Sequence, residues 1–150
     1  MTQVIIDGDA CPVTDSIIQL TEGTGIFVVL VRSYAHFSMR DYPDHVRVVY
    51  VDDGPDQVDY KIVQLAKPND IVVTQDYGLA NLLINKIQYV MHHNGMLYND
   101  KNINSLLEQR YLNAQTRRQG GRHKGPKKFS EETRNHFEQA FKRVINHISS

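Results

Sequence analysis

The sequence predicts an α/β sandwich with a mostly parallel central sheet, followed by a basic linker and a C-terminal helix. Segments with the apolar pattern of strands alternate along the chain with segments of helical periodicity, which is typical of such sheets. Residues 26–31 form a continuous β-branched and aromatic run, as expected of a strand buried on both faces. At 150 residues, the chain is long enough for one domain with a substantial core.

The chain begins with a short strand that ends in two aspartates. Residues 3–6 are apolar, and Asp7 and Asp9 follow on either side of a glycine. Pro12 stands where we expect the first turn of a helix over residues 13–22, because its fixed φ suits that position. The folding of an apolar segment does not by itself explain two carboxylates at its end, although a solvated acidic turn is the simpler alternative.

The middle of the chain is predicted to hold two more strands, at residues 26–31 and 46–51. A polar and aromatic loop follows the first of them, at residues 32–38. An acidic turn at residues 52–56 then leads into a helix over residues 57–66.

The next elements are a strand over residues 71–74, a helix over 77–85 and a strand over 89–91. The strand at 71–74 is followed by an acid, Asp76. A further helix is expected over residues 102–115.

The last part of the chain differs from the rest in charge. Residues 1–116 carry 8 Lys and Arg against 14 Asp and Glu, a net charge of −6, whereas residues 117–150 carry 9 against 3, a net charge of +6. We divide the chain accordingly into a domain and a second segment, which consists of a glycine-rich basic linker and a helix capped by Ser130 and is packed on the same domain. The apolar stripe of that helix is formed by Phe137, Phe141, Val144, Ile145 and Ile148.

The basic residues of this segment are predicted to contact the phosphates of nucleic acid, or else to neutralise the acidic domain. They are Arg117, Arg118, Arg122, Lys124, Lys127 and Lys128.

Composition excludes several classes of protein. No apolar run approaches the roughly 20 residues that span a bilayer, and the N-terminus lacks the basic start of a signal peptide. Cys11 is the single cysteine, which excludes an internal disulfide and a cysteine-cluster metal site. We therefore expect a cytoplasmic protein with no membrane partner.

Acidic residues follow the first and the fourth predicted strands. If these strands are neighbours, as at a topological switch point, Asp7, Asp9 and Asp76 converge on one edge of the sheet, where Asp56 and Asp59 also begin a helix. Several carboxylates cannot all stay ionised near pH 7 without a cation or raised pKa values. Mg²⁺ or Mn²⁺ is the simplest remedy, because both take oxygen ligands.

The four predicted metal-binding and catalytic residues are Asp7, Asp9, Asp59 and Asp76. Asp56 and Thr74 are expected beside them, orienting a phosphate or a metal-bound water. Asp56 and Asp59 have an alternative role as acids that the helix dipole favours at an N-terminus.

Three stretches carry a family resemblance: Asp7-Gly8-Asp9-Ala10-Cys11-Pro12-Val13, residues 69–80, and Gly125-Pro126-Lys127-Lys128-Phe129. With these stretches, the chain resembles the YaiI/YqxD family of bacterial proteins, which is related to PIN-like domains. The resemblance implies a PIN-like, Rossmann-like sheet and a Mg²⁺ or Mn²⁺ site of the ribonuclease type. It supports Asp7, Asp9 and Asp76 most, and Asp59 next.

We predict a metal-dependent ribonuclease, a hydrolase acting on single-stranded RNA. Two alternatives stay open. The first is a non-catalytic PIN-like module whose basic tail binds RNA. The second is a phosphatase of the haloacid-dehalogenase type with Asp7 as nucleophile and Asp9 as general acid/base, although Cys11 stands where those enzymes usually have Thr or Val.

Overall fold

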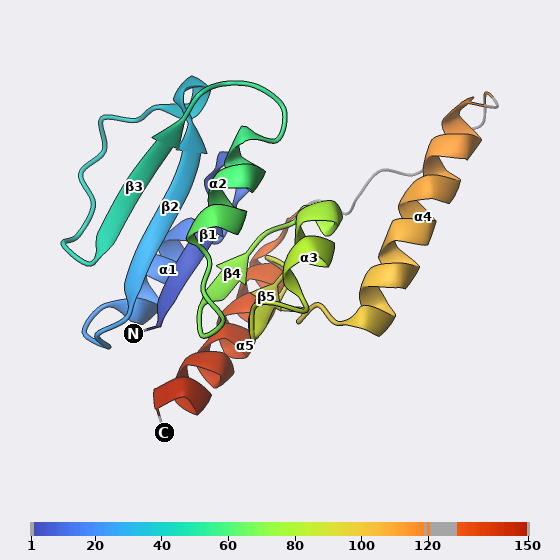
Figure 1. Ribbon diagram of the computed structural model, residues 1–150. Coiled ribbons are helices and arrows are strands. Elements are labelled where there is room, and N and C mark those ends of the chain that lie inside the picture. The colour runs from blue at the N-terminus through green and yellow to red at the C-terminus, as the bar shows by residue number, and fades with distance from the viewer. Residues whose placement is uncertain (1, 119, 121–128, 150) are drawn as a thin grey trace.

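The computed structural model describes residues 2–118, 120 and 129–149, and its centre is a five-stranded sheet (Figure 1). Every pair of neighbouring strands is parallel, and the strand order is β3-β2-β1-β4-β5. The strands are β1 (Gln3–Asp7), β2 (Phe27–Ser33), β3 (Val46–Val51), β4 (Ile71–Val73) and β5 (Tyr89–Met91). The predicted α/β class is confirmed, and the arrangement is consistent with a PIN-like, Rossmann-like fold.

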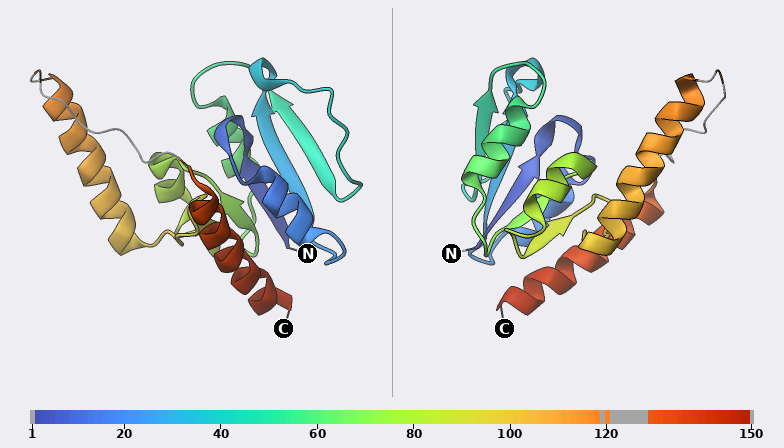
Figure 2. Two further views of the ribbon diagram at one scale, coloured as in Figure 1. Left: turned by 180° about the vertical axis from the view of Figure 1, so that it is seen from behind. Right: turned by 45° about the vertical axis from the view of Figure 1, so that its right-hand side comes forward.

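Helices cover both faces of this sheet (Figure 2). The helices α1 (Thr14–Thr21) and α5 (Glu131–Ser149) lie on one face, and α2 (Gln57–Leu65) and α3 (Tyr77–Leu83) lie on the other. A long helix, α4 (Asp100–Arg118), contacts α3 near its own start and then extends away from the sheet (Figures 1 and 2). None of the described helices combines the length and the apolar character that crossing a membrane requires.

The apolar residues of β1 contribute side chains to two hydrophobic cores, one on each face of the sheet. Val4 and Ile6 pack in the cluster beneath α1 and α5, whereas Ile5 packs in the cluster beneath α2 and α3. All three side chains are fully buried, because successive residues of a strand point to opposite faces and both faces are covered.

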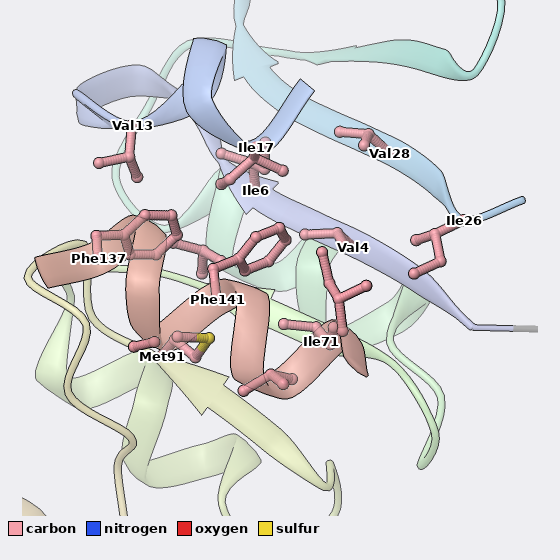
Figure 3. Close-up of a cluster of buried hydrophobic side chains, with 14 of the residues drawn as sticks. Val4, Ile6, Val13, Ile17, Ile26, Val28, Ile71, Met91, Phe137 and Phe141 are labelled. Atoms are coloured by element: carbon pink, nitrogen blue, oxygen red, sulfur yellow. The ribbon is translucent and has the colours of Figure 1, made fainter. Parts of the chain in front are cut away.

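The C-terminal helix α5 belongs to the first of these cores (Figure 3). Phe137 and Phe141 are fully buried and stack with ring centroids 5.4 Å apart. The predicted cap is confirmed, since the Thr133 N–H donates to Oγ of Ser130 at 3.1 Å. The Arg134 guanidinium also donates to the carbonyl of Pro12, in the turn before α1, at 2.9 Å. The last segment of the chain therefore forms part of the hydrophobic core on this face of the sheet.

Several predicted helix boundaries differ from the observed ones, by up to three residues. Helix α1 begins at Thr14, because residues Gly8–Ala10 form a short 3-10 helix, η1, and Cys11 is extended. Pro12 consequently lies in the turn before the helix and not in its first turn. Helix α4 starts at Asp100 and continues unbroken to Arg118, past the position where the linker was expected to begin.

Candidate functional site

The carboxyl ends of β1 and β4 lie side by side, as the sequence interpretation required. Val4, Ile5 and Ile6 of β1 pair with Ile71, Val72 and Val73 of β4. The strands after β1 in the sequence, β2 and β3, lie on one side of it, whereas β4 and β5 lie on the other. The boundary between β1 and β4 is therefore the switch point of the sheet. Ligand sites in open α/β sheets form just beyond such a point.

A depression of about 250 Å³ opens at this switch point. It brings together five acids from three segments that are distant in sequence: the end of β1, the start of α2 and the end of β4. The five are Asp7, Asp9, Asp56, Asp59 and Asp76, and they comprise all four predicted metal-binding residues and Asp56. The remaining lining residues are Ala10, Gly54, Val58 and Gln75.

Thr74 is buried beneath the depression and positions two of these acids. Its hydroxyl donates to Oδ2 of Asp7 at 2.8 Å and accepts from the Asp76 N–H at 3.0 Å. The Thr74 carbonyl in turn accepts from the Tyr98 hydroxyl at 3.1 Å, which fixes the end of β4 from below.

Three of the carboxylates are held through one oxygen each. Oδ2 of Asp7 accepts from Thr74, and Oδ1 of Asp76 accepts from the Leu79 N–H at 3.1 Å, capping α3. Oδ1 of Asp9 accepts from the Ser33 N–H at 2.9 Å. Within the described residues, the second oxygen of each carboxylate makes no hydrogen bond, which leaves it available to a ligand.

Burial, together with neighbouring negative charges, raises the pKa values of two of these acids. The pKa of Asp7 is raised by burial and by the charges of Asp76 and Asp9, against the lowering effect of the Thr74 hydrogen bond. The pKa of Asp59 is raised from 3.8 to about 6, first by burial and then by the charges of Asp76, Asp7 and Asp56. Both shifts mean that the site favours a positive charge, from a proton or a cation.

Gly8, between Asp7 and Asp9, packs against β2 without space for a side chain. A Cβ atom there would lie 2.8 Å from the Val31 carbonyl oxygen and 2.6 Å from Cδ1 of Leu30. The alternation of two acids around a glycine thus allows η1 to pack closely on the sheet while both carboxylates reach the depression.

Asp56 and Asp59 both lie at the N-terminus of α2, so a role as acids that the helix dipole favours stays open for both. Asp56 precedes α2 with a left-handed backbone (φ 67°), and its side chain makes no capping hydrogen bond. Asp59 lies in the first turn of α2, where the dipole also favours an acid.

Comparison with known proteins identifies the family. A family model described as "Uncharacterized BCR, YaiI/YqxD family" matches residues 5–147. The chain belongs to the YaiI/YqxD family. It is 66% identical over 147 residues to a UPF0178 protein of Staphylococcus epidermidis, covering 98% of this chain and 99% of that protein. It is 64% identical over 148 residues to UPF0178 proteins of Staphylococcus haemolyticus and Staphylococcus aureus, covering 99% of this chain and 100% and 97% of theirs. No solved structure matches the chain significantly.

The donor set of this YaiI/YqxD protein fits a hard divalent cation. Within the described part of the chain, no three His, Cys, Asp or Glu side chains are placed to hold one ion between them. Mg²⁺, however, commonly takes only one or two carboxylates and keeps several waters, which this open depression can accommodate. Asp7 and Asp76, which both hydrogen-bond Thr74, are the residues that would hold such an ion, with Asp9 and Asp59 lining the same depression.

The predicted basic residues are separated from the depression as far as the structure describes them. Arg117 and Arg118 lie in the last turn of α4, at the end of the helix farther from the sheet (Figure 2). The other four, Arg122, Lys124, Lys127 and Lys128, lie outside the described residues.

The loop after β2 supplies site residues that the sequence interpretation left unassigned. Nδ1 of His36 lies 3.2 Å from Oδ1 of Asp9, beside the Ser33 N–H bonded to the same oxygen. Asp53, an exposed residue of the turn after β3, accepts from the Ala35 N–H of this loop at 2.7 Å. The available signal was that a polar, aromatic loop directly follows a buried strand, at the same edge of the sheet as the acids.

Proposed function

We propose that this protein hydrolyses phosphodiester bonds in single-stranded RNA at the acidic depression, with Mg²⁺ or Mn²⁺ as cofactor, in the cytoplasm. One observation supports this most. Carboxylates from three distant segments meet at the β1/β4 switch point, and three of them have one oxygen held and the other available. When bound, the ion would supply Lewis acidity, lowering the pKa of a water and offsetting charge on the phosphate oxygens.

The residues of the chain have distinct roles in this proposal. Thr74 fixes the orientation of Asp7, and the α3 N-terminus fixes that of Asp76, so that both present an oxygen to the cation. Asp59 lies across the depression with its pKa near neutrality, which suits it to accept a proton from the attacking water. Asp56 and Gln75 line the same space and can orient that water. The six predicted basic residues, Arg117 and Arg118 at the end of α4 and the four that follow in the sequence, are proposed to hold the RNA through its phosphates.

The test is cleavage of an end-labelled, mixed-sequence single-stranded RNA by the full chain in Mn²⁺, Mg²⁺ or EDTA. Wild type should cleave only with metal, and Asp7→Asn and Asp76→Asn should abolish turnover. Asp52→Asn is the matched control, because Asp52 is exposed and does not line the depression.

Cleavage that persists in EDTA, or in both variants, contradicts the proposal. RNA binding without cleavage under any metal would instead favour the non-catalytic binding module. A phosphoenzyme trapped on Asp7 would favour the phosphatase.

A further inference from the structure

Two aromatic side chains are exposed on the loop that follows β2. Tyr34, in the short 3-10 helix η2 (Tyr34–His36), is 55% exposed, and Phe37 is 58% exposed. Both pack against the ring of Tyr50 on β3, with centroid distances of 5.6 Å for Tyr34 and 5.2 Å for Phe37. Neither belongs to either hydrophobic core, so the stability of the sheet does not explain them.

The loop that carries these rings is held in place by its own hydrogen bonds. The Ala35 N–H donates to Asp53 at 2.7 Å, and the Phe37 N–H donates to the Tyr34 carbonyl at 3.0 Å. The Ser38 N–H donates to the Tyr50 hydroxyl at 3.2 Å. A ligand that stacks on the rings therefore finds them already ordered and loses little affinity in fixing them.

Asp9 links this aromatic loop directly to the acidic depression. Its Oδ1 accepts a hydrogen bond from the N–H of Ser33, the residue before Tyr34, and lies 3.2 Å from Nδ1 of His36. Asp9 itself lines the depression. A single strand whose phosphate occupies the depression would therefore pass close to this loop.

We propose that Tyr34 and Phe37, supported by Tyr50, form a base-stacking platform that binds single-stranded RNA next to the acidic depression. The proposal rests on the proposed function and extends it to where the bases lie. Aromatic faces stack on any base, so such a platform binds single strands with little sequence preference. A duplex, whose bases are already stacked, offers it no free ring face.

The small size of the patch favours this ligand over a second copy of the chain. A stable protein interface buries about 1,200–2,000 Å² in total, and an aromatic side chain supplies only about 150–250 Å².

The experiment measures binding separately from turnover. A fluorescently labelled mixed-sequence RNA, and the same RNA with abasic sites at its centre, are titrated with full-length protein in EDTA and in Mg²⁺. Tyr34→Ala and Phe37→Ala should each weaken binding of the intact RNA by about 5- to 100-fold, whereas Tyr34→Phe should bind like wild type. Tyr111→Ala and Phe27→Ala are the controls, because these rings are also exposed, at 59% and 49%, but lie on α4 and at the opposite end of β2.

The abasic RNA distinguishes stacking from a general loss of affinity. Wild type should bind the abasic RNA more weakly than the intact RNA, by a factor similar to that caused by Tyr34→Ala. The Tyr34→Ala protein should bind the two RNAs almost equally. Equal binding of intact RNA by wild type and both alanine variants overturns the platform. The same loss of affinity for abasic RNA in all proteins overturns it as well. A change in sedimentation on replacing either ring, without a change in RNA binding, would assign the patch to self-association instead.

The cleavage assay separates this proposal from the preceding one. Metal-dependent cleavage with unchanged binding in Tyr34→Ala would reject the platform alone. Stacking-dependent binding without cleavage would reject the nuclease and keep the platform.

Discussion

Replacing Asp59 by asparagine should stabilise the metal-free protein at pH 8. The pKa of this carboxyl is raised from 3.8 to about 6, first by burial and then by its acidic neighbours. The folded chain therefore binds this proton more tightly than the unfolded chain. The associated stability is complete below about pH 3.8 and is lost as the pH rises through about 6.

The size of the effect follows from the same shift. At 1.36 kcal/mol per pKa unit, a rise from 3.8 to about 6 corresponds to about 3 kcal/mol at pH 8. Asp59 is only half-buried, so solvent screening reduces this to about 1 kcal/mol. For a chain of this size, the melting temperature should rise by about 2–4 °C.

Thermal unfolding in EDTA, at pH 8 and at pH 4, measures this effect. Asp59→Asn should melt higher than wild type at pH 8, and most of the difference should vanish at pH 4, where wild type keeps the proton. Asp52→Asn, at an exposed acid outside the depression, should match wild type at both pH values. An Asn variant that is less stable at pH 8, or a difference independent of pH, would refute the reasoning.

Three further substitutions test how the site and the core are built, each followed by urea unfolding in EDTA. Thr74→Val leaves Oδ2 of Asp7 and the N–H of Asp76 without their partner, and should cost about 1–3 kcal/mol, most of it recovered in Thr74→Ser. Asp76→Asn keeps an oxygen for the Leu79 N–H and should be neutral or mildly stabilising, whereas Asp76→Ala loses the cap and should cost about 1 kcal/mol. Phe141→Ala should cost about 3–5 kcal/mol in one cooperative transition, because α5 shares its core with β1; a separate early transition of the C-terminal segment would contradict this.

The sequence was sufficient to predict the acidic edge of the sheet, because two simple patterns coincide there. Apolar runs identify β1 and β4, and Asp7 and Asp76 follow their ends. The remaining condition was that these strands be neighbours, which the strand order meets. The prediction of α5 also succeeded, because its apolar stripe and its Ser130 cap are both local signals.

The misplaced start of α1 shows where local signals are insufficient. The fixed φ of Pro12 is compatible with a turn as well as with a first helical turn. Close packing of Gly8 on β2 decides between them, because η1 then occupies the residues after β1 and the helix begins later.

The contacts of Asp9 and Asp53 could not be read from the sequence, because they join segments that only the folded chain brings together. Asp9 accepts a hydrogen bond from the N–H of Ser33, 24 residues away in the sequence. Asp53 accepts one from the N–H of Ala35, 18 residues away. Nothing in the local pattern of either acid indicates a partner at that distance. The Asp9 contact attaches the aromatic loop to the acidic depression, so the proposed platform could be inferred only from the structure.

The most direct test of the metal site is Mn²⁺ binding, measured by electron paramagnetic resonance on the full chain. Wild type should bind Mn²⁺, and Mg²⁺ should compete for it. Asp7→Asn and Asp76→Asn should each bind at least about tenfold more weakly, while Asp52→Asn should bind like wild type. Equal affinity in all four proteins, or no binding by wild type, would contradict a divalent cation site at the β1/β4 switch point.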